Sequence, residues 1–159
     1  MKVHLIVVGR VRGVLRTAVE HYEERAGHYW RLEVVEVEAG APGRAPEPER
    51  VREAEGERIR SRLPAHAPLW VLTREGKAWS SERWARELGA KALHGAPGPA
   101  ILVGGAFGIA DALVKEAERR VSLGPVTLPH EMARLVLAEQ LYRAGTIQRN
   151  EPYHKGRGE

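Results

Sequence analysis

The chain has 159 residues, of which 43% are hydrophobic and 29% charged. This composition is typical of a globular protein and argues against a disordered chain, and the length suits a single domain over residues 1–159. No apolar run approaches the roughly 18 residues that a membrane span needs, and the apolar stretch at residues 3–8 is too short for a secretory signal. We therefore expect a cytoplasmic protein with no membrane partner.

The counts of ligating residues restrict the chemistry. Cysteine is absent, which excludes disulfides, thiolate metal sites and a cysteine nucleophile. The single aspartate, Asp111, rules out a paired-aspartate site, and the histidines show no metal-ligand spacing, so we predict no metal. The glutamates mostly alternate with arginines at helical spacing, which is typical of solvated faces. The net charge of +4 is compatible with a polyanionic partner.

The first half of the chain alternates strands with helices. Residues 3–9 form a β-branched run ending in glycine, which predicts a buried strand. Apolar residues at helical spacing over 15–26 predict an amphipathic helix. Residues 32–37 predict a second strand, whose glutamates favour a position near an edge of the sheet. After a loop rich in proline and glycine, residues 51–63 predict a highly charged surface helix.

The middle of the chain is more apolar. Residues 69–73 predict a strand, and residues 74–79 a loop. Ser80 or Ser81 then caps a third helix, because a serine hydroxyl can accept from the free amides of a first turn. A second breaker-rich stretch leads to residues 100–105, which predict a central strand ending in paired glycines.

The last third is expected to hold two more helices. Asp111 can cap a short helix, and residues 121–128 form an extended, glycine-interrupted segment. Pro129 suits the first turn of a final helix that runs through Tyr142, and residues 148–159 form a polar tail. Strands alternating with helices predict an α/β fold, with a mainly parallel sheet flanked by helices on both faces.

Two glycine-containing loops are candidates for ligand binding, because ligands of such sheets lie beyond the carboxyl ends of the strands. Glycines at residues 104–108 allow backbone amides to approach a ligand closely, although the spacing matches neither a dinucleotide fingerprint nor a P-loop. Residues 123–130 expose backbone polar groups beside apolar side chains, a combination that can bind an adenine. A tight turn and a rigid crossover are the alternative interpretations.

His130 and His154 are candidate acid–base groups, and a cap or surface role is the alternative for each. Basic and aromatic residues also gather around the last helix and the tail. Such a set can neutralise phosphates and stack on exposed bases, which favours an RNA partner, although basic tails are common. The set is Tyr142, Arg143, Arg149, Tyr153, His154, Lys155 and Arg157.

Four segments together resemble one family. They are Val-His-Leu-Ile-Val-Val-Gly at 3–9, Leu-Thr-Arg-Glu-Gly-Lys at 72–77, Leu-Val-Gly-Gly at 102–105, and a C-terminal block. That block starts with Ser-Leu-Gly-Pro-Val-Thr-Leu-Pro-His at 122–130 and continues to Leu-Tyr-Arg-Ala and Pro-Tyr-His. Over essentially the whole chain, the sequence resembles the RlmH family of SPOUT RNA methyltransferases.

The resemblance implies a SPOUT-type α/β knot, with a deep trefoil knot near the C-terminus, and a homodimer. It also implies that S-adenosylmethionine binds in the knot as the cofactor. The implied activity is methylation of N3 of a pseudouridine in 23S rRNA, in the large ribosomal subunit or the assembled ribosome. A true knot is too rare to be expected from periodicity, so it rests on the resemblance alone.

Carried over by position, the resemblance assigns cofactor contacts to a set of residues at strand ends. They are Leu72, Thr73, Gly105, Gly124, Pro125, Val126, Thr127, Leu128 and Pro129. For the nucleotide, we hypothesise that Arg143, Tyr153 and His154 bind or orient it, supplied across the dimer, with His130 assisting.

The chain departs from the family pattern at four positions. Thr73 stands where Asp is usual and Ala106 where Pro is usual. Gly145 replaces a bulkier residue, and Glu151 replaces a frequent His. Two alternatives stay open: a SPOUT methyltransferase with another RNA target such as tRNA, and a non-catalytic RNA-binding protein of the same fold.

Overall fold

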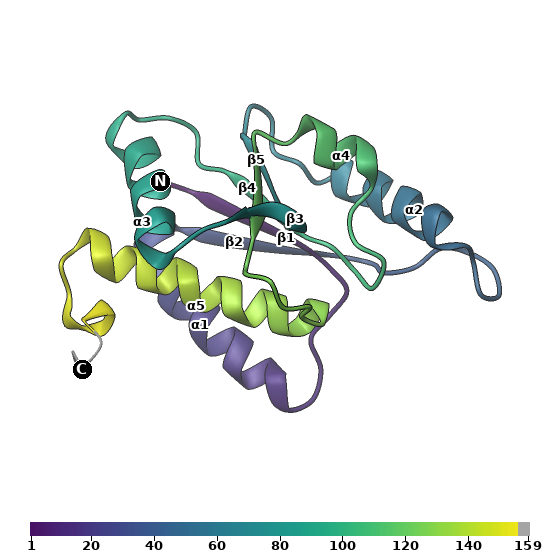
Figure 1. The fold of residues 1–159 in the computed structure, drawn as a ribbon, viewed down its shortest axis with the longest axis horizontal. Coiled ribbons are helices and arrows are strands. Elements are labelled where there is room, and N and C mark those ends of the chain that lie inside the picture. The colour runs from purple at the N-terminus through teal and green to yellow at the C-terminus, as the bar shows by residue number, and fades with distance from the viewer. Residues whose placement is uncertain (156–159) are drawn as a thin grey trace.

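The computed structural model describes residues 1–155. In this part of the chain, five strands form one sheet in the order β2-β1-β4-β3-β5, and every neighbouring pair is parallel (Figure 1). The strands are β1 (Val3–Val8), β2 (Leu32–Val37), β3 (Leu69–Ala78), β4 (Ala100–Val103) and β5 (Arg119–Ser122). The predicted parallel sheet is confirmed, and β2 lies at an edge as its glutamates indicated.

Helices cover both faces of the sheet, as predicted. They are α1 (Val14–Trp30), α2 (Pro48–Arg60), α3 (Ser81–Leu93), α4 (Asp111–Glu116) and α5 (His130–Gln148), followed by the 3-10 turn η1 (Pro152–His154). α1, α3 and α5 pack on one face, where Trp30, Trp84 and Leu141 enter the core. α2 and α4 cover the other face through Ile59 and Leu113.

β1 explains why the chain needs helices on both sides. Its alternate residues point to opposite faces, so that Leu5 and Val7 enter one core while Ile6 and Val8 enter the other. All four side chains are almost completely buried. A strand buried on both faces reads as a continuous apolar run, which is the pattern that the sequence has.

The ladder between β3 and β5 contains a register shift. Leu72 and Lys77 both pair with Val121, so the residues between them lie outside the ladder as in a large bulge. Gly76 is required at the return, because a Cβ there would lie 2.6 Å from the backbone N of Val121. The prediction of a loop at 74–79 is therefore wrong in part, since β3 resumes after the bulge.

Three helix starts test the predicted caps. Ser80 caps α3, with its Oγ accepting from Arg83 N at 3.2 Å. Asp111 does not cap α4: Ala110 occupies the cap position without a side-chain hydrogen bond, and Asp111 lies in the first turn. α2 begins at Pro48, earlier than predicted, because proline needs no amide partner in a first turn.

The C-terminal trefoil knot stays a prediction.

No helix within residues 1–155 is long and apolar enough to cross a membrane. The predicted tail at 148–159 is described only to Lys155, so Arg157 lies outside the described residues.

A buried ion pair joins α5 to α1. Arg134 Nε and Nη2 donate to the two carboxylate oxygens of Glu23 at 2.6 and 3.1 Å, and Nη1 lies 3.4 Å from Glu36 Oε2 on β2. Burial by itself lowers the pKa of Arg134, but the hydrogen bonds and charge of Glu23 and Glu36 outweigh it and raise the pKa. The guanidinium therefore stays charged inside the α1–α5 contact.

Replacing Arg134 tests this pair. We expect Arg134→Met to lower the free energy of unfolding by about 3 kcal/mol, because Glu23 would be left buried without its partner. Arg16→Met is the matched control, since the Arg16–Glu20 pair is exposed and such pairs contribute at most about 1 kcal/mol. Urea denaturation measures both, and equal losses in the two variants would contradict the prediction.

Candidate functional site

A cavity of about 750 Å³ opens at the carboxyl ends of β3, β4 and β5. Parallel strands bring these ends to one edge of the sheet, where α/β proteins bind their ligands. Three segments line it: the bulge after Leu72, the loop after β4, and the loop between β5 and α5. We call this space the main cavity.

The loop after β4 is shaped by its glycines. A Cβ on Gly104 would lie 2.7 Å from Ile109 Cγ1, so the turn can close only without a side chain there. Gly108 N donates to Gly105 O at 3.1 Å, and Gly108 has φ +82°. This tight turn carries Phe107, which is 47% exposed, to the rim of the main cavity.

The loop after β5 turns on a serine and a glycine. Gly124 N donates to Ser122 Oγ at 3.1 Å, and the same hydroxyl donates to Gly124 O at 2.9 Å. Gly124 has φ +124°, a conformation that residues with a Cβ rarely adopt. The turn holds the main chain of the following residues along the main cavity.

Most of the predicted cofactor residues meet in the main cavity. The lining includes Leu72, Thr73, Gly105, Gly124, Val126, Thr127, Leu128 and His130. Pro125 and Pro129 belong to the same loop but do not line the space. Sequence reasoning missed Arg52, Phe107 and Arg120, which also line it. Phe107 lies in the glycine-containing loop at 104–108 that the sequence marked, although its side chain was not singled out, whereas nothing in the local pattern marked Arg52.

The other predicted site residues lie together elsewhere, at the far end of α5. Arg143 Nε and Nη2 donate to Glu139 Oε1 at 3.0 and 2.6 Å, and Tyr153 Oη donates to the same oxygen at 3.0 Å. The Arg143 guanidinium also stacks 4.9 Å from the centre of the Tyr153 ring. We call Glu139, Arg143, Tyr153 and His154 the tail cluster.

Two side chains of the tail cluster are partly enclosed by the protein. Burial, and then Tyr22 and Glu139, raise the pKa of Tyr153, so its hydroxyl stays protonated and acts as a donor at neutral pH. His154 Nδ1 is buried and has no hydrogen-bond partner among residues 1–155. A ring nitrogen in this state can hydrogen-bond to a nucleotide that reaches it.

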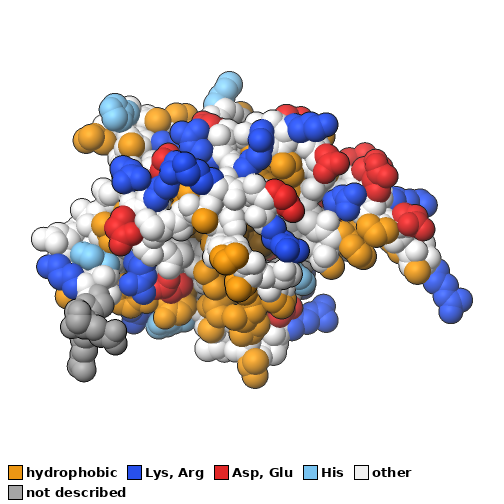
Figure 2. All heavy atoms as spheres, viewed as in Figure 1, with side chains coloured by type: hydrophobic (Ala, Val, Ile, Leu, Met, Phe, Trp, Pro, Cys, Tyr) orange, Lys and Arg blue, Asp and Glu red, His pale blue; other side chains and the backbone are white. Residues whose placement is uncertain are grey.

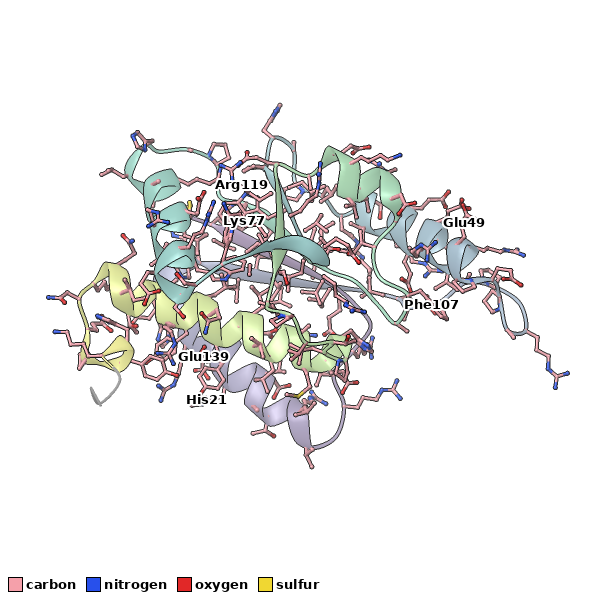
Figure 3. All side chains as sticks on the ribbon, viewed as in Figure 1. His21, Glu49, Lys77, Phe107, Arg119 and Glu139 are labelled. Carbon is pink, nitrogen blue, oxygen red and sulfur yellow. The ribbon has the colours of Figure 1, made fainter. Side chains whose placement is uncertain are left out.

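The tail cluster and His130 do not meet within one chain. They lie at opposite ends of α5, and thirteen residues of helix between His130 and Arg143 span about 20 Å. In Figure 3, Glu139 of the tail cluster lies on α5, well apart from Phe107 at the rim of the main cavity. The predicted set of His130, Arg143, Tyr153 and His154 is therefore split between two places.

A metal cluster was not expected from the sequence, and among residues 1–155 no three His, Asp or Glu side chains are grouped so as to hold an ion.

Residues 1–154 match the family described as predicted SPOUT methyltransferase. The chain belongs to the SPOUT methyltransferase family. It is 49% identical to the ribosomal RNA large subunit methyltransferase H of Gemmatimonas aurantiaca, over 98% of this chain and 100% of that protein. It is 39% identical to the protein of the same name from Syntrophotalea carbinolica, over 97% of this chain and 99% of the relative. The resemblance noted from the motifs is confirmed.

A solved structure shares the fold of this SPOUT methyltransferase. A probable methyltransferase from Bordetella pertussis matches with a TM-score of 0.58, covering 90% of this chain and 95% of the other at 18% identity. The likeness supports the α/β fold alone. Membership of a methyltransferase family implies a methyl-donor cofactor.

Two departures of this SPOUT methyltransferase from its family pattern share one neighbour, Tyr29. A Cβ on Gly145 would lie 2.3 Å from Tyr29 Cγ, so the tyrosine ring fills the space of a larger side chain. The Tyr29 hydroxyl hydrogen-bonds to Glu151 Oε2, which raises the pKa of Tyr29 to about 12. α1 thus holds both the end of α5 and the start of the tail.

A third departure lies at the main cavity. Thr73 occupies the position where the family usually has Asp, and its Oγ1 donates to Glu75 Oε2 at 2.6 Å. This hydrogen bond lowers the pKa of the Glu75 carboxyl. Both residues line the main cavity.

Proposed function

We propose that this chain transfers a methyl group from S-adenosylmethionine to N3 of a pseudouridine in 23S rRNA of the large ribosomal subunit. One observation carries the proposal: most of the residues that the family motifs assign to the cofactor line a single cavity at the carboxyl edge of the sheet. The names of the full-length relatives support an rRNA substrate. The whole chain acts as one domain, in the cytoplasm where ribosomes are.

The main cavity suits S-adenosylmethionine. Its volume of about 750 Å³ lies in the range of pockets that bind cofactor-sized ligands. Leu72, Ile109 and Leu128 offer apolar walls to a purine, and the turns at Gly105 and Gly124 leave main-chain groups free of side-chain cover. When bound, the cofactor supplies an electrophilic methyl group on a positively charged sulfur.

The chain's own residues bind and orient the nucleotide. The target N3–H is an imide and is acidic enough that positioning and stabilisation of developing negative charge on its carbonyl oxygens supply much of the catalysis. Arg143 can stabilise that charge, while Tyr153 donates a hydrogen bond and His154 orients the base. His130, at the main cavity, assists from the cofactor side.

A second copy of the chain completes this arrangement. The tail cluster lies about 20 Å along α5 from His130, so it can reach a main cavity only in another protomer. Hydrophobic side chains gather over α5 in the lower centre of Figure 2; Met132, Leu135 and Val136 of this helix are only half-buried. We propose that α5 forms a homodimer contact there and that each tail cluster serves the partner's cavity.

Cofactor binding is tested at Gly124. A Cβ at φ +124° strains the turn by on the order of 1–3 kcal/mol, so we expect Gly124→Ala to lose roughly tenfold or more in affinity for S-adenosylmethionine by calorimetry. Gly95→Ala is the control, because Gly95 also has a positive φ and open space around it but lies after α3, outside the main cavity. Absence of binding heat when S-adenosylmethionine is added to the unchanged protein would refute its assignment as the cofactor.

The substrate is tested by methyl transfer to ribosomes and to naked rRNA. Because the chain is small and only mildly basic, with a net charge of +4, we expect much faster turnover on assembled ribosomes that contain the pseudouridine. Equal rates on both would contradict this expectation. Transfer to tRNA instead would support the alternative target, and cofactor binding without any transfer would support a non-catalytic RNA-binding protein.

Mixing two impaired variants, assayed at a limiting concentration of S-adenosylmethionine, tests the shared site. Gly124→Ala damages the main cavity and Arg143→Ala the tail cluster, so a heterodimer holds one site in which both parts are intact. After equal mixing and exchange of protomers, we expect recovery of about a quarter of the normal activity. No recovery, with heterodimers demonstrated by mass spectrometry, would place the tail cluster's action within its own chain.

A further inference from the structure

A second cavity of about 520 Å³ lies beside the main cavity. The two share Gly105, Ala106, Phe107 and His130 as a common border. Figure 3 shows Phe107 at the outer end of the loop after β4, on the side of the molecule where α2 lies. The remaining lining is almost entirely apolar and consists of Val8, Ala39, Gly40, Ala41, Ala45, Pro46, Val51 and Glu55.

Glu55 is the exception in this apolar lining. It is only 3% exposed, and its Oε1 accepts from Gly40 N at 2.9 Å. Its Oε2 is buried and has no hydrogen-bond partner among residues 1–155. A carboxylate has about four acceptor sites, so most of the hydrogen-bonding capacity of this side chain is unused.

The position of the carboxylate points to the border between the cavities. Both of its oxygens lie 3.1–3.2 Å from the point where a Cβ on Gly105 would be, and Gly105 lines both spaces. The absence of a side chain at 105 therefore leaves room for the carboxylate beside the shared wall. A ligand atom at this border can reach Glu55 and the main cavity together.

A purely structural role accounts poorly for Glu55. It follows Val51 and precedes Ile59 at helical spacing on the buried face of α2, where an apolar side chain would pack without loss. An unpaired buried carboxylate oxygen is costly, and the single bond to Gly40 could be made by a glutamine. The cost is offset if a ligand brings an N–H group to Oε2.

The loops around the second cavity favour RNA as the source of this N–H. Arg44 lies in the loop whose neighbouring residues line the cavity, and Arg10 and Arg12 follow β1 close to Val8. All three are exposed, and no ion pair involves them within residues 1–155. Exposed arginines next in the chain to residues of an apolar cavity suit a base that binds inside while its phosphates stay outside.

We propose that the second cavity receives the target base and that Glu55 Oε2 accepts a hydrogen bond from its N1–H. This inference rests on the proposed function. Pseudouridine carries two ring N–H groups, and N3 must face the main cavity to be methylated, so N1–H is the donor left for the protein. In uridine, N1 forms the glycosidic bond and carries no hydrogen. The ring position that faces Glu55 is then C5–H, which is a poor hydrogen-bond donor. Glu55 is therefore the residue that selects pseudouridine over uridine.

Glu55→Gln tests this selection. The glutamine keeps the shape and an oxygen for Gly40 N, but it turns an NH2 group toward N1–H, placing donor against donor. On ribosomes whose target is pseudouridine, we expect kcat/KM to fall roughly ten- to a hundredfold. On ribosomes with uridine at that position, the rate stays within about twofold, so that the preference for pseudouridine is largely lost.

The controls separate this role from others. Glu57→Gln makes the same charge change on the exposed side of α2 and should leave both rates unchanged. Equal losses on the two substrates, unaltered selectivity, or a weaker affinity for S-adenosylmethionine in Glu55→Gln would overturn the proposal; the last outcome would mean that Glu55 binds the amino group of the cofactor. If the unchanged enzyme methylates neither substrate, the proposed function fails instead.

A second variant keeps the test independent of α2. Ala41 lies in a loop and lines only the second cavity, so Ala41→Phe should fill that space without disturbing the core. We expect it to abolish methyl transfer while the affinity for S-adenosylmethionine stays within about twofold. Normal transfer by this variant would show that the base binds elsewhere.

Discussion

The carboxyl edge of the sheet depends on one close approach between two backbones. Gly76 lets β5 pass so near to β3 that any side chain there would overlap Val121. Because β3 returns to the ladder at this point, the residues between Leu72 and Lys77 are pushed out of the sheet, and there they form one side of the main cavity. The cavity is therefore a consequence of how β3 pairs with β5, and not of a loop added to a regular sheet.

α5 sets the second constraint. Its first turn places His130 at the border of both cavities, and Glu139 in the middle of the helix binds Arg143 and Tyr153 of the tail cluster. The buried pair of Arg134 with Glu23 fixes the helix on α1, so the two ends cannot approach one another by bending. A helix of this length separates the main cavity from the tail cluster within one chain, so under the proposed function a symmetric pair of chains is the simplest way to bring the two together.

The sequence predicted the regular parts of the fold better than its exceptions. The run at β1 and the cap at Ser80 follow local rules, and the motifs assigned most of the main cavity. The continuation of β3 was missed because the pairing of Lys77 with Val121 depends on a distant strand. The general pattern of glutamates on solvated faces does not hold for Glu55, whose spacing from Val51 and Ile59 places it on the apolar face of α2. The knot has no periodic signature at all.

Three of the four departures from the family pattern, at Thr73, Gly145 and Glu151, are in contact with neighbouring side chains. The hydroxyl of Thr73 donates to Glu75 Oε2 at 2.6 Å. The volume absent at Gly145 is filled by the ring of Tyr29, and the same tyrosine binds Glu151 at the start of the tail. The consequence of a departure in this chain therefore follows from the contacts that the residue makes, and not from its identity alone.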